Sequence, residues 1–189
     1  MIRIAVVGDI GAGKSHVAKS FGLPLFNADV EVGKLYKNDK IIYNKLKKSL
    51  SKYIYLFPIN KNEILKAILA NESNLLKIVK IIHPEIRKKM NIFLKKNKKK
   101  KIVVLDIPLL LENKINKKKD ILVFVQSKKK EIFKRLKKRK NFNLSLLKKF
   151  KNIQLPLVYK KKKSHFIIKN NFTNKGIKRS ISNILEEIL

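Results

Sequence analysis

Short apolar runs and longer segments with helical spacing alternate along most of the chain. The apolar runs lie at 2–7, 23–29, 102–107, 121–125 and 165–169, and they predict five β-strands. Their apolar residues are continuous rather than alternating, which is typical of strands that are covered on both faces. Because helical segments separate them, the pattern predicts an α/β fold with a parallel, doubly wound five-stranded sheet.

The segment between the second and third predicted strands has no strand pattern. Apolar residues recur at helical spacing at 41–50, 64–69, 75–82, from Pro84 onwards, and later in the chain at 146–157, with Gln154 beside that helix, and at 177–188. Asn60 and Glu63 have the residue types and spacing of a helix N-terminal cap. The long helical segment is therefore predicted to be a subdomain inserted into the sheet fold, where an acceptor substrate can bind.

Composition changes the interpretation of the charge. The 189 residues suit one domain, and the net charge is +34, but 42 of the 47 basic residues are lysine. Lys, Ile and Asn fill 86 positions and share A/T-rich codons, so compositional drift explains the excess better than a DNA-binding surface. The lysine runs at 98–101 and 160–163 lack interleaved aromatic residues and are predicted to be solvated turns. We expect no specific nucleic-acid partner.

Three features bear on the compartment. The chain has no cysteine, which fits a reducing environment. The longest apolar run, 102–111, is too short to span a membrane and contains Asp106 and Pro108. The N-terminus lacks a long apolar stretch with a cleavage site, so no secretory signal is expected. These features predict a cytoplasmic protein without a membrane partner.

The first predicted strand runs directly into Gly-Asp-Ile-Gly-Ala-Gly-Lys-Ser at 8–15, which matches the phosphate-binding P-loop pattern. Glycines allow a tight turn and a close approach of backbone amides to phosphate. Lys14 is placed to reach the β- and γ-phosphates of ATP, and the Ser15 hydroxyl to ligate Mg²⁺. The predicted nucleotide-binding residues here are Gly8, Gly11, Ala12, Gly13, Lys14, Ser15 and His16, the last through its backbone.

The chain has only five aspartates, so each is weighed separately. Asp9 lies in the P-loop, Asp39 in a polar stretch where it is predicted to be solvated, and Asp120 at the start of the fourth strand. Asp29 and Asp106 follow the second and third strands, and ligands gather at the carboxyl ends of strands in open α/β sheets. One carboxylate can act as the base and the other, Asp106, can support the metal.

Two arginines stand out in a chain that uses lysine almost everywhere. Arg135 and Arg139 are spaced i, i+4 near the end of a predicted helix and so share one face. Guanidinium groups bind phosphate oxygens in a planar, bidentate manner. Both are candidate phosphate-binding residues, with two plain surface residues as the alternative.

Taken in order, several motifs resemble the dephospho-coenzyme A kinase family. They are GDIGAGKS at 8–15, GLPLFNAD at 22–29, HP at 83–84, DIPLLLEN at 106–113, KRLKKR at 134–139, Gln154, and a last strand followed by Asn170. The resemblance covers nearly the whole chain. The P-loop is generic, whereas the AD ending, HP and PLLLE together are far more discriminating.

The resemblance implies a nucleoside-monophosphate-kinase-like fold. Its parts would be a nucleotide-binding core (1–33, 101–138 and 158–189), a helical coenzyme-A-binding region (34–100) and a mobile lid (139–157). It implies transfer of the ATP γ-phosphate to the ribose 3′-hydroxyl of dephospho-CoA, with Asp29 as general base and Arg139 on the closing lid. The chain departs from the family at Asn27, where Asp is usual, and at Ser164 and His165, which replace an Ala-Asp pair. Lys61 stands in the place of an arginine.

Three alternatives remain open. Another P-loop kinase acting on a nucleoside monophosphate would share every phosphate-binding argument. A GTPase switch should carry an Asn-Lys-x-Asp motif, but the stretch 116–120 has one residue too many. A nucleic-acid-binding protein would leave the P-loop and both strand-end aspartates unexplained. The pattern does not indicate an oligomeric state.

Overall fold

The computed structural model describes residues 1–139 and 142–189. The chain forms two compact units. The first comprises Met1–Asn27, Leu94–Phe142 and Ile153–Leu189, and the second comprises Ala28–Phe93 and Asn143–Asn152. The second unit is thus made of two segments of chain, each flanked on both sides by segments of the first.

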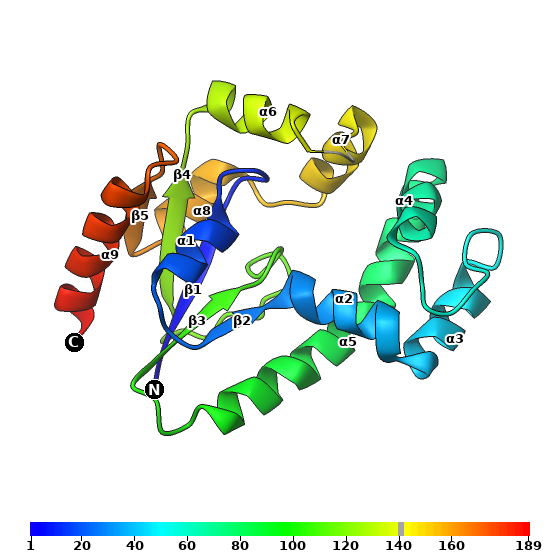
Figure 1. Ribbon diagram of the computed structural model, residues 1–189, viewed down its shortest axis with the longest axis horizontal. Helices are drawn as coiled ribbons and strands as arrows, with labels where there is room; N and C mark the ends of the chain where they lie inside the picture. The colour runs from blue at the N-terminus through cyan, green and yellow to red at the C-terminus, as the bar shows by residue number, and fades with distance from the viewer. Residues whose placement is uncertain (140–141) are drawn as a thin grey trace. The chain divides into compact units, whose positions relative to one another are not determined.

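A single parallel sheet is the centre of the first unit (Figure 1). Its strands are β1 (Ile2–Gly8), β2 (Leu25–Asn27), β3 (Ile102–Asp106), β4 (Ile121–Gln126) and β5 (Phe166–Lys169), in the order β2-β3-β1-β4-β5. All neighbours are parallel, so the predicted fold class is confirmed. The register pairs Gly8 with Val125 and Asn27 with Asp106, which brings the P-loop and the ends of β2 and β3 to one edge of the sheet.

Helices surround this sheet within the first unit. They are α1 (Lys14–Ser20), α6 (Lys129–Lys137), α8 (Leu157–Lys163) and α9 (Asn174–Ile188). Every residue of β3 is buried, as expected for a strand covered on both faces. The C-terminal helix α9 contributes Ile177, Ile181 and Ile184 to the core at helical spacing.

A buried ion pair joins β1 to the turn before β4. Arg3 Nη2 lies 2.8 Å from Asp120 Oδ2, which also accepts a hydrogen bond from the Lys117 amide. Both residues are buried, with 7% and 3% of their surface exposed. Burial raises the pKa of the Asp120 carboxyl, although the Lys117 amide and the Arg3 guanidinium both act in the opposite direction. The sequence pattern gave no hint of this pair.

The second unit is helical. It contains α2 (Ala28–Asn38), α3 (Lys40–Ser49), α4 (Lys61–Ala70), α7 (Leu144–Asn152) and all but the last turn of α5 (Glu72–Lys96). The Asn60 side chain caps α4 by accepting from the Asn62 amide, as predicted. Asp39, which was predicted to be solvated, is half-buried, and its carboxylate accepts from the Ile42 amide and caps α3.

Two helix boundaries differ from the pattern, and each difference involves a proline. Pro84 was predicted to begin a helix but lies inside the single helix α5. An interior proline removes one helical hydrogen bond without necessarily ending the helix. The amphipathic helix predicted through 146–157 instead ends at Asn152, and α8 begins after Pro156. The residue before a proline disfavours helical geometry, which separates the two helices. None of the helices in the described part of the chain is both long and apolar enough to cross a membrane.

Candidate active site

The P-loop connects β1 to α1 with glycines in a backbone region that other residues avoid. Gly8 has φ 148°, and Gly13, the residue before α1, has φ 92°. A Cβ atom on Gly8 would lie 2.7 Å from the Val125 carbonyl oxygen, so the strand and the loop touch closely here. A Cβ atom on Gly13 would lie 2.4 Å from Asn170 Nδ2. The predicted glycines are therefore needed for both conformation and space.

Two side chains from other strand ends hold the middle of this loop. The Ala12 carbonyl accepts a hydrogen bond from Ser127 Oγ at 2.9 Å and from Asn170 Nδ2 at 2.8 Å. Asn170 is buried, and its Oδ1 accepts from the Phe172 amide at 2.8 Å. The loops after β4 and β5 thus fix the P-loop backbone through a single carbonyl group.

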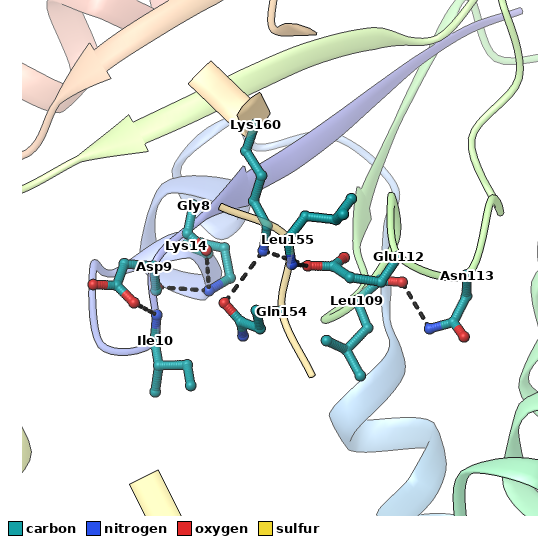
Figure 2. Close-up of polar contacts among 10 residues, drawn as sticks. All are labelled: Gly8, Asp9, Ile10, Lys14, Leu109, Glu112, Asn113, Gln154, Leu155 and Lys160. Carbon is teal, nitrogen blue, oxygen red and sulfur yellow. Dashed lines mark hydrogen bonds and ion pairs between the residues drawn. The ribbon is translucent and has the colours of Figure 1, made fainter. Parts of the chain in front are cut away.

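Lys14 is the first residue of α1, and its side chain turns back toward the loop. Its ammonium donates to the carbonyl oxygens of Asp9 at 2.8 Å and Gly8 at 3.3 Å (Figure 2). Ser15 and His16 are exposed. The His16 backbone amide donates to the Gly13 carbonyl, while its ring Nε2 lies 3.0 Å from Asn174 Oδ1. The His16 amide is therefore bonded to the P-loop, and its ring lies against α9.

Asp106 ends β3 and is buried, with 2% of its surface exposed. Asn27, at the end of β2, donates from Nδ2 to Asp106 Oδ2 at 2.6 Å. A carboxylate in place of Asn27 would put two like charges side by side, whereas the amide donates to Asp106. Asn27, where the resemblance expects Asp, thus gives Asp106 a hydrogen-bond donor in place of a second carboxylate.

Asp29 was predicted to end the second strand, and this placement is wrong. The strand stops at Asn27, and Asp29 lies in the first turn of α2, exposed, in the second unit. A carboxylate in the first turn is stabilised by the helix dipole, which favours helix over strand here. The assignment of Asp29 as the base stays a prediction.

The two predicted arginines do not share a helix. Arg135 lies in α6, and its guanidinium carbon is 4.2 Å from the centre of the Phe172 ring. Arg139 was expected on the same helical face, but α6 ends at Lys137 and the Arg139 amide donates to the Leu136 carbonyl in a tighter turn. Its side chain is exposed. Of the predicted lid 139–157, residues 140 and 141 lie outside the described residues.

A cavity of about 420 Å³ lies beside Asn170, whose side chain holds the P-loop. Its lining comes from the ends of β4 and β5 and from the start of α6: Gln126, Ser127, Lys128, Glu131, Lys169, Asn170 and Asn171. The lining is rich in amide groups and has charges of both signs. A cavity of this size, with convergent polar groups, is typical of a small-molecule site.

A second cluster of polar side chains lies next to Lys14 (Figure 2). Lys160 was predicted to be solvated within its lysine run, and this is wrong, because it lies in α8 with 4% of its surface exposed. Its Nζ is 2.6 Å from Glu112 Oε1 and 3.2 Å from Gln154 Oε1. Glu112 Oε1 also accepts from the Leu155 amide at 3.0 Å. These side chains and Lys14 line the same small hollow.

Sequence reasoning missed Ser127 and Lys160 as site residues. Ser127 directly follows the fourth strand, and the rule that ligands gather at strand ends would have identified it. Lys160 carries no such signal, because its three neighbours in the run are also lysine. Only its ion pair with Glu112, a half-buried residue of the PLLLE motif, distinguishes it.

The comparisons agree with this geometry. A sequence profile described as dephospho-CoA kinase matches residues 2–175. The chain belongs to the dephospho-CoA kinase family. A dephospho-CoA kinase from Wolbachia pipientis wMel is 36% identical over 129 residues, which cover 66% of each of the two chains. The family resemblance noted from the motifs is therefore confirmed.

Solved structures support the fold. A structure from Thermus thermophilus called TT1252 superposes with a TM-score of 0.76 at 20% identity and covers 100% of this chain and 98% of its own. A dephospho-CoA kinase from Campylobacter jejuni gives a TM-score of 0.56 at 21% identity and covers 98% and 96%, respectively. At these identities the likeness concerns the fold, which is that of P-loop kinases.

Proposed function

We propose that this protein phosphorylates the ribose 3′-hydroxyl of dephospho-CoA with ATP, giving coenzyme A and ADP, the last step of coenzyme A biosynthesis. The observation that carries the proposal is the family match over residues 2–175. The tethered P-loop, with Lys14 at its end, supports it. Such a kinase acts in the cytoplasm, where its small-molecule substrates are found.

The described residues supply groups for the donor nucleotide. The P-loop and Lys14 bind the phosphates. The nucleoside enters the cavity that Asn170 helps to line. Phe172, whose amide donates to Asn170 Oδ1, has its ring against the Arg135 guanidinium. Arginine–aromatic pairs of this kind bind flat, polarisable groups such as a base.

Mg²⁺ fits the donor set at the end of β3. The described residues contain no group of three or more carboxylate or histidine side chains that would hold a metal alone. Mg²⁺ in kinases is instead held by one or two protein oxygens together with substrate phosphates and water. Ser15 and Asp106 would hold it, and it would neutralise charge on the phosphates.

The transfer itself needs a base and a closing cation. Asp29 orients the acceptor hydroxyl and takes its proton late in a loose transition state. Arg139 neutralises phosphate charge when the lid, 139–157, closes over both substrates. The helical region 34–100 holds the acceptor.

The test is product identification with purified protein, ATP, Mg²⁺ and dephospho-CoA. We expect coenzyme A and ADP to form in equal amounts, as resolved by chromatography and mass spectrometry. ATP hydrolysis without a phosphorylated acceptor would reject the proposal.

A further inference from the structure

Lys160 connects three segments of the first unit at the edge of the P-loop. Its ammonium contacts Glu112 in the loop after β3 and Gln154 in the segment before α8. Glu112 in turn accepts from the Leu155 amide. A buried ion pair is rarely retained for stability alone, because well-packed apolar residues do as well. The geometry therefore needs another explanation.

The chemistry of the contact determines how Gln154 is oriented. A lysine ammonium can only donate hydrogen bonds, so the Gln154 amide must present its oxygen to Lys160. Its nitrogen, with two N–H donors, then turns away from Lys160. Figure 2 shows this arrangement, with the Gln154 oxygen joined to the Lys160 ammonium and its nitrogen pointing away from Lys160.

The hollow that these residues line has a volume of about 10 Å³, which is room for one oxygen-sized group. Gly8, Lys14, Gln154 and Lys160 all line it. Glu112 neutralises the charge of Lys160. On the side of the hollow lined by Gln154 and Lys160, an incoming oxygen therefore meets the amide donors of Gln154 rather than a second full positive charge. An oxygen that enters the hollow would meet the P-loop lysine on one side and the Gln154 amide on the other.

We propose that Gln154 donates a hydrogen bond to an oxygen of the phosphoryl group in transfer, and that Lys160 and Glu112 are positioning residues that hold its amide in place. This inference rests on the proposed phosphoryl transfer. A donor fixed in advance stabilises charge that develops in the transition state without reorganisation during the reaction.

The first experiment replaces the amide alone. Gln154→Met keeps the length of the side chain and removes both donors. We expect kcat to fall by about 10²-fold, as for the loss of other fixed donors, with the ATP dissociation constant and the melting temperature nearly unchanged. A folded Gln154→Met variant with wild-type kcat would overturn the proposal.

The second experiment tests positioning. Lys160→Met combined with Glu112→Gln removes the pair without leaving a buried charge. If Lys160 acts through Gln154, adding Gln154→Met to this pair lowers kcat no further than Gln154→Met alone. Multiplying losses would show that Lys160 does not act through Gln154. Lys162→Met, an exposed lysine of the same helix, is the matched control and should keep wild-type kcat. If the pair variant does not fold, the Gln154→Met result decides.

A separate readout distinguishes this inference from the proposed function. The slow hydrolysis of ATP without an acceptor also transfers the phosphoryl group, in that case to water. If the wild type fails to phosphorylate dephospho-CoA, the proposed function fails. The role of Gln154 is then tested by the hydrolysis rate alone. We expect Gln154→Met to lower it by about the same factor as that expected for kcat, and an unchanged hydrolysis rate would overturn the inference.

Discussion

At the scale of single residues, the Ala12 carbonyl is the point at which other segments hold the P-loop backbone in place. Ala12 is held by Ser127 and Asn170, which come from two different strand ends. Asn170 also binds the Phe172 amide and contacts Gly13. Its side chain therefore links the loop that binds phosphate to the segment that we assign to the nucleoside.

We expect Asn170→Ala to destabilise the protein by about 1–3 kcal/mol, because it removes two hydrogen bonds made by a buried side chain. ATP affinity should fall as well, since the loop loses one of its two anchors. Ser127→Ala is the matched comparison, because it removes the other donor to the same carbonyl but leaves the Phe172 amide satisfied. Urea unfolding and calorimetric ATP titration measure both effects. A larger loss for Ser127→Ala than for Asn170→Ala would contradict this ranking.

In the proposed reaction, Lys14 supplies a fixed positive charge where the transferred phosphoryl group develops charge. We expect Lys14→Ala to lower kcat by about 10²-fold or more. Lys19→Ala, an exposed lysine on the same helix, is the control and should keep its activity. Steady-state kinetics of both variants check the prediction, and near-wild-type turnover by a folded Lys14→Ala would remove the P-loop from the mechanism.

Residue-level prediction succeeded where a local pattern dictates the structure. The three P-loop glycines have the positive φ angles that the motif requires, and Asp106 lies at the end of β3 as expected. Rarity alone was no guide, because Asp29 and Arg139 are also rare residue types and lie outside the elements expected for them. Lys160 was missed because burial is a property of the fold, and nothing in the sequence separates it from the other lysines. The role of Asn170 followed from a hydrogen bond between residues 158 positions apart, which no local pattern contains.

At the scale of elements, the strands were predicted well and the helix ends poorly. Continuous apolar runs located all five strands. The reason holds for the central strands β1, β3 and β4, which are buried on both faces, whereas the edge strand β5 has only Ile168 buried. Helix ends depend on a balance of a few hydrogen bonds. Pro84 is accommodated within α5, whereas Pro156 separates α7 from α8. The same residue type thus has opposite outcomes, and packing decides between them.

The buried pair between Arg3 of β1 and Asp120 before β4 allows a prediction about stability. We expect Asp120→Ala to lower the free energy of unfolding by about 3–5 kcal/mol, because it leaves the Arg3 guanidinium buried and unpaired. Glu85→Ala breaks an exposed pair with Lys88 and should change stability by about 1 kcal/mol or less. Urea unfolding at neutral pH measures both variants. Equal losses of unfolding free energy in Asp120→Ala and Glu85→Ala would show that burial of the Arg3–Asp120 pair does not matter.

The same carboxyl predicts a pH dependence. Burial raises the pKa of Asp120 in the folded protein above its unfolded value. The folded state therefore binds the proton more tightly, and this contribution to stability is fully present below the ordinary aspartate pKa. It is lost as the pH rises through the raised value. Across this range, the unfolding free energy of the wild type should fall with rising pH relative to that of Asp120→Asn, because only the wild type carries this carboxyl.

At the scale of the whole molecule, the charge of +34 is a separate matter from the chemistry. We expect weak binding to duplex DNA, without sequence preference and with a steep loss of affinity as salt is raised. Kinase activity should not require DNA. Fluorescence anisotropy at two salt concentrations, with two unrelated duplexes, measures this. Tight binding that resists salt and selects one sequence would show that the lysines form a real nucleic-acid site.

The division into two units sets a limit on what the sequence predicts. Most of the candidate site lies in the first unit: the P-loop, the residues Ser127 and Asn170 that hold it, Asp106, and the cluster around Gln154. Asp29 lies in the second unit. Local motifs therefore located the P-loop and Asp106 at one edge of the sheet, while their roles in the reaction stay predictions. The acceptor side depends on how a helical region binds a substrate, and its apolar pattern reports packing rather than specificity.

The most direct test of the central claim is a comparison of acceptors under one set of conditions. Dephospho-CoA, AMP, CMP, dTMP and shikimate are each supplied with ATP and Mg²⁺, and kcat/KM is measured for each, with Asp29→Asn run alongside. We predict that dephospho-CoA is preferred by about 10²-fold or more, because recognition of its distinctive groups is costly to lose. Asp29→Asn should lower its turnover by about 10²–10⁴-fold. Preferred turnover of a nucleoside monophosphate would contradict the account and point to a different P-loop kinase.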